Sequence, residues 1–219
     1  MTQRLILHSY WRSSCSYRVR IGLGAKGLGF DLRAVNLLEG AQLRPEYTSL
    51  SPSGYVPALT LADEVFVESL PILELLDELY PEPRLLPTTP QARARVRALC
   101  EMINAGIQPL QNLNVVRKVS SDAAEQKSWM QHFIRKGLAA FEARLCELEA
   151  RADGPKGPFV YGEAFGMADC FLIPQVYAAR RNGVDLTAMP RIERAIAASA
   201  KLPFVEAAHP DAQPDAVLT

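Results

Sequence analysis

The stretch SYWRSSCSYRVRIGL, residues 9–23, brings small polar side chains to the start of a helical pattern. Ser13, Ser14 and Cys15 lie at its centre. A serine here favours a helix N-terminus, because its oxygen accepts a hydrogen bond from a backbone N–H group that has no partner inside the helix. The same N–H groups and the helix dipole stabilise an anion, and a thiolate is one. Residues 13–15 therefore form either a plain helix cap or part of an anion site.

The composition excludes several classes of function. The 219 residues carry 24 Lys and Arg and 24 Asp and Glu, so we expect no basic surface of the kind that binds nucleic acid. Charges interrupt the apolar stretches before the roughly 20 residues of a membrane span, and residues 1–10 lack a signal-peptide hydrophobic region. We therefore expect a cytoplasmic protein that binds neither nucleic acid nor a membrane.

The cysteines and histidines show no spacing typical of a metal site. They are Cys15, Cys100, Cys146, Cys170, His8, His132 and His209, and no two cysteines form a CxxC pair. Motifs for phosphate binding, dinucleotide binding and serine hydrolysis are missing as well. We therefore expect no metal, no disulfide framework, and chemistry that comes from a bound cofactor.

Strand and helix patterns alternate over the first third of the chain. An apolar run at 5–7, a helical pattern at 14–26 and an alternating run at 30–35 predict a parallel, right-handed βαβ unit. Residues 58–67 then read as a hairpin, and Ser69 caps an apolar helix that ends at residue 79. This order predicts a four-stranded mixed sheet covered by helices, an α/β thioredoxin-like domain.

Prolines then separate this domain from an all-helical region. Pro81, Pro83, Pro87 and Pro90 cannot continue a helix and indicate a linker. Strand patterns nearly vanish beyond it, and helices are expected over 91 to about 119, 123 to about 151, 167–181 and 191–200. We therefore divide the chain into an α/β domain at 1–82, a linker at 83–90 and an all-α domain at 91–219.

Six motifs in order span nearly the whole chain. They are RSSCSYRVRI (12–21), SPSGYVPAL (51–59), ES (68–69), GIQPLQNL (106–113), ADCFLIPQV (168–176) and RNGVDLTAMP (181–190). Together with the two-domain order, they resemble the zeta class of the glutathione transferase superfamily, to which maleylacetoacetate isomerases belong. The resemblance implies the glutathione transferase architecture, in which the first domain binds glutathione and the second contributes the substrate site.

The resemblance also assigns the polar residues of the opening stretch. It implies that Ser13 is the main donor to a glutathione thiolate, with Ser14 and Cys15 beside it. A free thiol titrates near 8.5, and each unit by which its pKa falls corresponds to about 1.4 kcal/mol in favour of the anion. A plain N-cap followed by a buried cysteine remains the alternative from the local sequence.

Other glutathione contacts follow from the same resemblance. Pro57 would be cis and Val56 would pair its backbone with the cysteinyl unit. Glu68 suits the γ-glutamyl ammonium, Ser69 suits its carboxylate, and Gln42 is a further polar contact. The remaining implied glutathione-binding residues are Ser16, Tyr17, Arg18, Gln108, Asn112, Leu113 and Asn114.

Two features of the helical region point to the substrate. Gln108 and Asn112 are four apart, so they would share one helix face, which the resemblance places at the cleft between domains. Arg181, rather than Arg180, matches the family's arginine for the substrate carboxylate. One departure is Gly166, because the family has Ser or Thr there, three residues before Asp169, as a reciprocal cap; Asp169 can still bind backbone amides.

The resemblance implies a reaction. We expect glutathione-dependent cis–trans isomerisation of maleylacetoacetate, a dicarboxylic diketo acid, to fumarylacetoacetate in tyrosine and phenylalanine breakdown. Maleylpyruvate isomerisation and broader transferase activity on α-haloacids are alternatives within the enzyme class. A non-catalytic binding protein of glutathione transferase shape is the alternative from another class. By analogy with the superfamily, we expect a homodimer.

Overall fold

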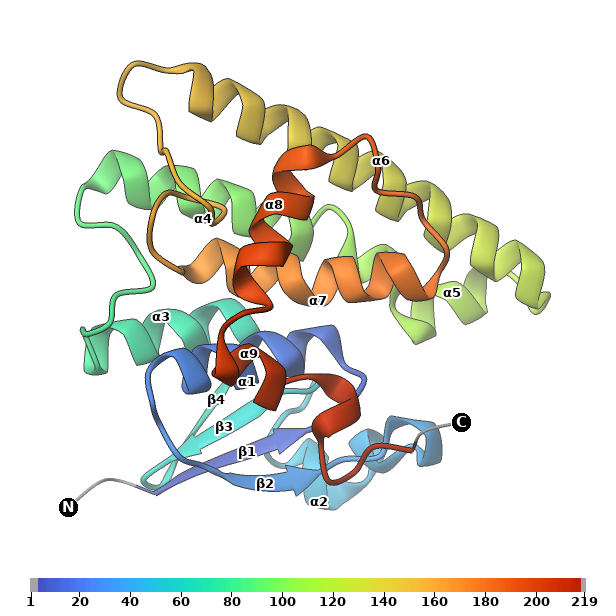
Figure 1. Cartoon of the computed structure of the whole chain (residues 1–219). Coiled ribbons are helices and arrows are strands. Elements are labelled where there is room, and N and C mark those ends of the chain that lie inside the picture. Colours follow the sequence, from blue (N-terminus) through green and yellow to red (C-terminus); the bar gives the residue numbers. More distant parts are fainter. Residues whose placement is uncertain (1–3, 218–219) are drawn as a thin grey trace. The chain divides into compact units, whose positions relative to one another are not determined.

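The computed structural model describes residues 4–217 and divides the chain into two compact units. The first unit comprises Met1–Arg84 with Leu202–Thr219, and the second comprises Leu85–Lys201. This division differs from the expected one at the C-terminal end, because the chain from Leu202 onward belongs to the α/β unit. Figure 1 shows the helices and strands of both units.

A four-stranded mixed sheet forms the centre of the first unit. Its strands are β1 (Leu5–Ser9), β2 (Asp31–Ala34), β3 (Ala58–Leu61) and β4 (Glu64–Val67). They lie in the order β2-β1-β3-β4, with β1 parallel to β2 and antiparallel to β3, and β3 antiparallel to β4. The predicted α/β class with its mixed sheet is confirmed.

Helices pack on both faces of this sheet (Figure 1). Leu7 on β1 lies in one apolar core with Val19 of α1 (Ser14–Ala25) and Ile72 of α3 (Ser69–Leu79). A second core contains Tyr47 of α2 (Pro45–Thr48) on the opposite face. The short elements of this unit are η1 (Leu37–Glu39), η2 (Ala41–Leu43), α9 (Pro203–Ala207) and η4 (Pro210–Ala212).

The C-terminal segment packs on α1, far from it in sequence. A Cβ atom added to Gly24 would lie 3.0 Å from Cβ of Phe204, so the absence of a side chain lets α9 approach α1 closely. Arg20 of α1 is buried and donates from Nε to the Ala208 carbonyl at 3.0 Å. Residues 202–217 are therefore part of the α/β unit by packing.

The second unit is helical. Its helices are α4 (Pro90–Asn104), η3 (Gln108–Gln111), α5 (Leu113–Val119), α6 (Ala123–Ala150), α7 (Met167–Arg181) and α8 (Pro190–Ser199). The prediction of a single helix over 91 to about 119 was wrong, because this part of the chain forms three helices, α4, η3 and α5. Pro109 lacks an N–H group and stands in η3, where a continuous helix would need that hydrogen bond.

Asp169 holds the start of α7 in place of a complete reciprocal cap. Its Oδ2 accepts the Gly166 N–H at 2.9 Å, and its Oδ1 accepts the Val160 N–H at 3.0 Å. Gly166 has no side chain that could accept the Asp169 N–H. Only the bond from the Gly166 N–H to the Asp169 carboxylate is therefore present, as the sequence predicted. A Cβ at Gly166 would lie 3.0 Å from the Leu85 carbonyl oxygen, which accepts the Met167 N–H.

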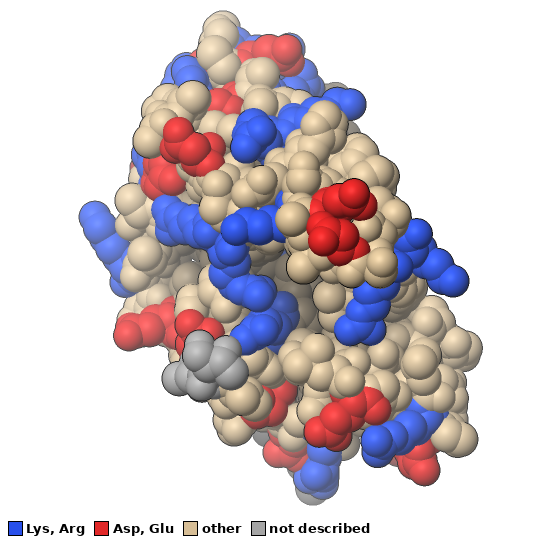
Figure 2. Space-filling view, turned by 90° about the vertical axis from the view of Figure 1, so that its right-hand side faces the viewer, with Lys and Arg blue, Asp and Glu red and all other residues tan. Residues whose placement is uncertain are grey.

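Charged side chains of both signs lie on the face that Figure 2 shows. Figure 2 shows Lys and Arg interspersed with Asp and Glu over the face in view, with uncharged residues between them. Within residues 4–217, none of the helices combines the length and apolar character that a bilayer span requires.

Candidate functional site

The strand register brings three segments to one end of the sheet. His8 near the end of β1 pairs with Ala58 at the start of β3, and Ala58 pairs with Val67 at the end of β4. The segment after β1, the segment before β3 and the segment after β4 therefore leave the sheet at the same end. These segments carry Ser13–Cys15, Val56–Pro57 and Glu68–Ser69, so the register gathers the expected glutathione-binding residues of the first unit.

Ser13 is the N-cap of α1. Its backbone is extended (φ −67°, ψ 120°), and its Oγ accepts the Ser16 N–H at 3.2 Å. A hydroxyl that accepts through its oxygen keeps its hydrogen for a second bond. Ser14 and Cys15, both half-buried, follow in the first turn, where backbone N–H groups have no partner inside the helix. The cap and the anion site are therefore compatible.

The three expected residues after Cys15 are buried. Ser16 accepts the Tyr10 N–H through Oγ at 3.5 Å, and Tyr17 lies edge-on to His209. Arg18 donates from Nη1 to Oγ of Ser69 at 3.0 Å. These side chains lie under the N-terminus of α1, where they hold the loop and the start of α3.

Ser69 is not the cap of α3, contrary to the sequence prediction. The N-cap is Glu68, which makes no side-chain cap bond, and Ser69 is the first helical residue. Glu68 is exposed and has φ 67° and ψ 124°, a backbone conformation that costs a non-glycine residue about 1–3 kcal/mol. This backbone places an exposed carboxylate directly before a helix N-terminus.

Hydrogen bonds from two side chains hold the segment before β3, which contains Val56 and Pro57. The Val56–Pro57 bond is cis, as the resemblance implied. The Tyr55 carbonyl accepts the Tyr47 hydroxyl at 2.6 Å and the Ser51 hydroxyl at 3.0 Å. Burial raises the pKa of Tyr47 to about 12, which keeps this phenol a donor.

Gln42 lies on η2 beside this segment. Its backbone carbonyl oxygen would be 3.2 Å from a Cβ atom added to Gly54, whose φ is +67°. Its side-chain Oε1 is buried and has no hydrogen-bond partner among residues 4–217. A buried acceptor without a donor is costly, so this oxygen is suited to an N–H group from a ligand.

Gln108 and Asn112 do not share a helix face, which corrects the sequence prediction. Gln108 starts η3, and Asn112 is the N-cap of α5, with its Oδ1 accepting the Asn114 N–H at 3.4 Å. Leu113 and Asn114 are the exposed first residues of α5. The expected cleft between the domains stays a prediction.

Contacts from α6 and α7 hold the η3 segment. Trp129 donates from Nε1 to the Leu110 carbonyl at 2.8 Å, and the Gln111 amide donates to the Gln175 amide oxygen at 2.9 Å. Gln175 lies in one of the six motifs, but the sequence gave it no role. In the structure it holds Gln111 of η3.

The two arginines at the end of α7 differ in their surroundings. Arg180 forms an ion pair with Glu193 at 2.8 Å. Arg181 lies 5.6 Å from the centroid of the Tyr177 ring, and no carboxylate of the described residues pairs with it. Arg181 is therefore the arginine of this pair that is available to an external carboxylate.

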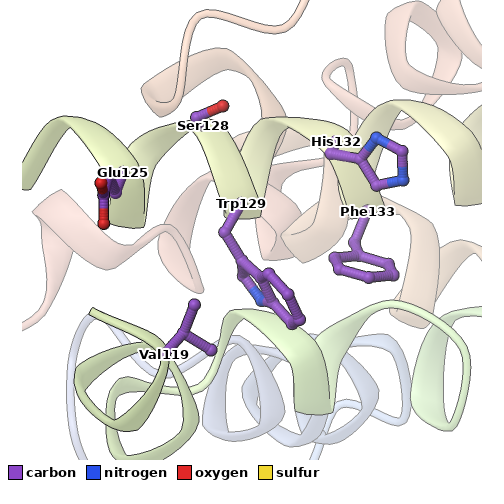
Figure 3. A pocket seen from close by; sticks show the side chains of 6 residues that line it. All are labelled: Val119, Glu125, Ser128, Trp129, His132 and Phe133. Atoms are coloured by element: carbon purple, nitrogen blue, oxygen red, sulfur yellow. The ribbon is translucent and has the colours of Figure 1, made fainter.

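A pocket of about 460 Å³ lies elsewhere in the second unit, along α5 and α6 (Figure 3). Its lining residues are Val119, Glu125, Ser128, Trp129, His132 and Phe133. None of the residues expected from the sequence to bind glutathione or substrate lines it.

The sequence prediction gave no role to Arg12, which directly precedes Ser13. The guanidinium carbon of Arg12 lies 4.2 Å from the centroid of the Trp11 ring. The position of Arg12 in the sequence could have indicated a role, because a cation next to a helix N-terminus adds to the electrostatic field that stabilises an anion.

The comparisons with known proteins agree with this fold. The family of glutathione S-transferase N-terminal domains matches residues 7–84. A zeta-class glutathione S-transferase of Euphorbia esula is 43% identical over 217 residues, covering 97% of this chain and 92% of that protein.

Two solved structures extend the likeness to three dimensions. Maleylacetoacetate isomerase from Anaeromyxobacter dehalogenans, with glutathione bound in its active site, has a TM-score of 0.88 and 43% identity, covering 98% of this chain and 99% of that one. A bacterial zeta-class maleyl pyruvate isomerase in its holo form has a TM-score of 0.91 and 36% identity, covering 97% and 100%. The chain belongs to the zeta class of the glutathione S-transferase family.

Proposed function

We propose that this chain is a glutathione-dependent isomerase that converts maleylacetoacetate to fumarylacetoacetate. The observation that carries the proposal is the helix start at Ser13, where a hydroxyl that already accepts the cap bond keeps its hydrogen for a sulfur anion. The 43% identity to a maleylacetoacetate isomerase that binds glutathione supports the same reading.

The donor set fits glutathione. Ser13 and the first N–H groups of α1 suit a thiolate, and Glu68 and Ser69 suit the ammonium and carboxylate of the γ-glutamyl unit. Val56 before the cis proline offers backbone for pairing with the cysteinyl unit. The buried Oε1 of Gln42 accepts no hydrogen bond from residues 4–217, so it suits an N–H group of glutathione. We propose that Gln108, Asn112, Leu113 and Asn114 add contacts from the second unit.

The chemistry that glutathione supplies when bound is addition of its thiolate to the cis double bond, rotation about the resulting single bond, and elimination of the same thiolate. Ser13 stabilises the anionic sulfur by donating its hydroxyl hydrogen, with Ser14 and Cys15 beside it and the cation of Arg12 nearby. Arg181 holds a substrate carboxylate through its guanidinium fork, so that the acid stays in place while its geometry changes.

The wider setting is part of the proposal. Residues 1–82 would bind glutathione and the helical region would contribute the substrate arginine. The protein would act in the cytoplasm, as a homodimer, in tyrosine and phenylalanine breakdown. The family resemblance supports the domain roles, the homodimer and the pathway, and the charges that interrupt the apolar stretches of the sequence support the cytoplasmic location.

Maleylpyruvate isomerisation is the second candidate, because a maleyl pyruvate isomerase matches with a TM-score of 0.91. A spectrophotometric assay of both maleyl substrates, with and without glutathione, separates the two. We expect glutathione-dependent turnover with a higher kcat/KM on maleylacetoacetate. A higher value on maleylpyruvate would select the second candidate. Turnover of neither substrate, with retention on immobilised glutathione, would indicate a binding protein.

A further inference from the structure

The C-terminal segment reaches back to the loop that carries Ser13. Asp215 accepts the Trp11 N–H through Oδ2 at 3.0 Å, although 204 residues separate the two. The segment is itself folded, since the buried Gln213 donates from Nε2 to the carbonyls of Ala207 and His209, both at 2.9 Å. Asp215 is thus presented to the loop by an ordered turn.

Arg20 holds the other side of the same residue. Its guanidinium is buried and donates from Nη2 to the Trp11 carbonyl at 3.0 Å. It also donates to Oγ of Ser9 at the end of β1 and to the Ala208 carbonyl. Arg20 therefore ties the strand, the loop and the C-terminal segment together.

Trp11 is consequently fixed at its N–H, at its carbonyl and through its side chain. The indole is 3% exposed and lies in the second core, against which Ala216 packs. Ser13 follows two residues later, and its N–H donates to the Tyr10 carbonyl at 3.0 Å, within the same turn. The position of the Ser13 hydroxyl thus depends on the backbone that Asp215 and Arg20 hold.

We propose that Asp215 is a positioning residue for the glutathione thiolate, acting with Arg20 through Trp11 on Ser13. The inference rests on the proposed function. Its carboxylate makes an incomplete set of bonds, because Oδ1 is buried without a hydrogen-bond partner among residues 4–217. The bond that its other oxygen, Oδ2, accepts comes from the Trp11 N–H of the loop, and not from the backbone of its own turn.

The test compares three variants in the full-length protein. Asp215→Ala removes the acceptor, Asp215→Asn keeps a side-chain oxygen of the same length, and Asp211→Ala is the matched control, an exposed aspartate of the same segment. Three quantities are measured: hydrogen exchange of the Trp11 amide without ligand, the pH titration of bound glutathione thiolate by ultraviolet absorbance, and kcat/KM.

We expect Asp215→Ala to speed Trp11 amide exchange about tenfold and to lower kcat/KM about five- to tenfold, as loss of one hydrogen bond to a charged group allows. The pKa of the bound thiol should rise by about half a unit or more. Asp215→Asn should lie near the wild type and Asp211→Ala should match it. Should Asp215→Ala not fold, Asp215→Glu, whose extra methylene displaces the carboxylate, carries the same test.

Faster Trp11 exchange with an unchanged thiol titration and unchanged kcat/KM would overturn the proposal and leave a structural contact. Unchanged exchange would overturn it at the first step. If the wild type binds no glutathione, the proposed function fails and this inference with it, and the exchange data then report only how the loop is held.

Discussion

Arg18 donates from Nη1 to Oγ of Ser69 at 3.0 Å, in a contact buried between α1 and α3. Because the serine oxygen accepts this bond, its hydrogen is left to donate to an anion at the helix start. The arginine of the first helix thus orients a hydroxyl that belongs to the third, and both lie under the proposed γ-glutamyl site.

This contact predicts that Ser69→Ala raises the glutathione KM about tenfold with a smaller change in kcat, because the lost hydroxyl binds the cofactor rather than the reacting atoms. Ser49→Ala, an exposed serine of the same unit, should leave both constants unchanged. Initial rates over a range of glutathione concentrations decide. An unchanged KM in Ser69→Ala would exclude Ser69 from the γ-glutamyl contact.

The end of α7 gives a second prediction. Arg181→Ala should raise the KM for the maleyl substrate at least tenfold and leave glutathione binding unchanged, since a charged hydrogen-bonded pair with the carboxylate is lost. Arg180→Ala is the neighbouring control, and it should cost at most about 1 kcal/mol of stability, because its ion pair with Glu193 is exposed. Equal substrate KM values in the two variants would remove the proposed role of Arg181.

Lys26 supports the first unit through a fully satisfied buried ammonium. Nζ lies 2.6 Å from Oδ1 of Asp77 and donates to the carbonyls of Tyr80 at 2.7 Å and Pro83 at 2.5 Å. Lys26→Met should therefore destabilise the fold by about 3–5 kcal/mol, because it removes the ammonium that pairs with the buried Asp77 carboxylate. Urea unfolding of Lys26→Met, Asp77→Leu and the double variant measures this. A double variant no more stable than Lys26→Met would contradict the stated cause.

The buried carboxyl group of Asp169 should make the free energy of unfolding depend on pH. Burial raises the pKa of this carboxyl to about 7, against about 4 in the unfolded chain. The folded state therefore binds the proton more tightly, so this group's contribution is full below pH 4 and is lost as the pH rises through 7. The loss is at most about 4 kcal/mol.

The measurement is the free energy of unfolding at several pH values between 4 and 8, for the wild type and Asp169→Asn. The wild type should lose stability relative to the variant as the pH rises. Parallel curves would show that Asp169 does not titrate in this range.

Local patterns predicted much of the fold. The apolar runs at 5–7 and within 58–67, and the polar start of α1, depend on neighbours in sequence, and the structure confirms the strands and the helix there. Pro109 removes one helical N–H group, but a missing N–H group alone does not say whether the helix continues beyond the proline or ends there. It resumes as α5 only after Asn112 provides a new cap.

The contacts that organise the site depend on packing, and the sequence could not predict them. Arg18 with Ser69 and Asp215 with Trp11 join residues 51 and 204 positions apart. The sequence prediction places the segment that starts at residue 202 in the helical domain. Short helices carry no sequence signal that tells on which unit they pack. The place of this segment became evident only from the close approach of Phe204 to Gly24.

The central claim is that Ser13 stabilises the thiolate of glutathione. The most direct measurement is the ultraviolet titration of glutathione bound to the wild type, Ser13→Ala and Ser13→Thr. We predict a bound-thiol pKa well below 8.5 in the wild type and the threonine variant, and a rise of at least one unit in Ser13→Ala with about a hundredfold loss of kcat. A bound thiol that titrates identically in the wild type and Ser13→Ala would contradict the account.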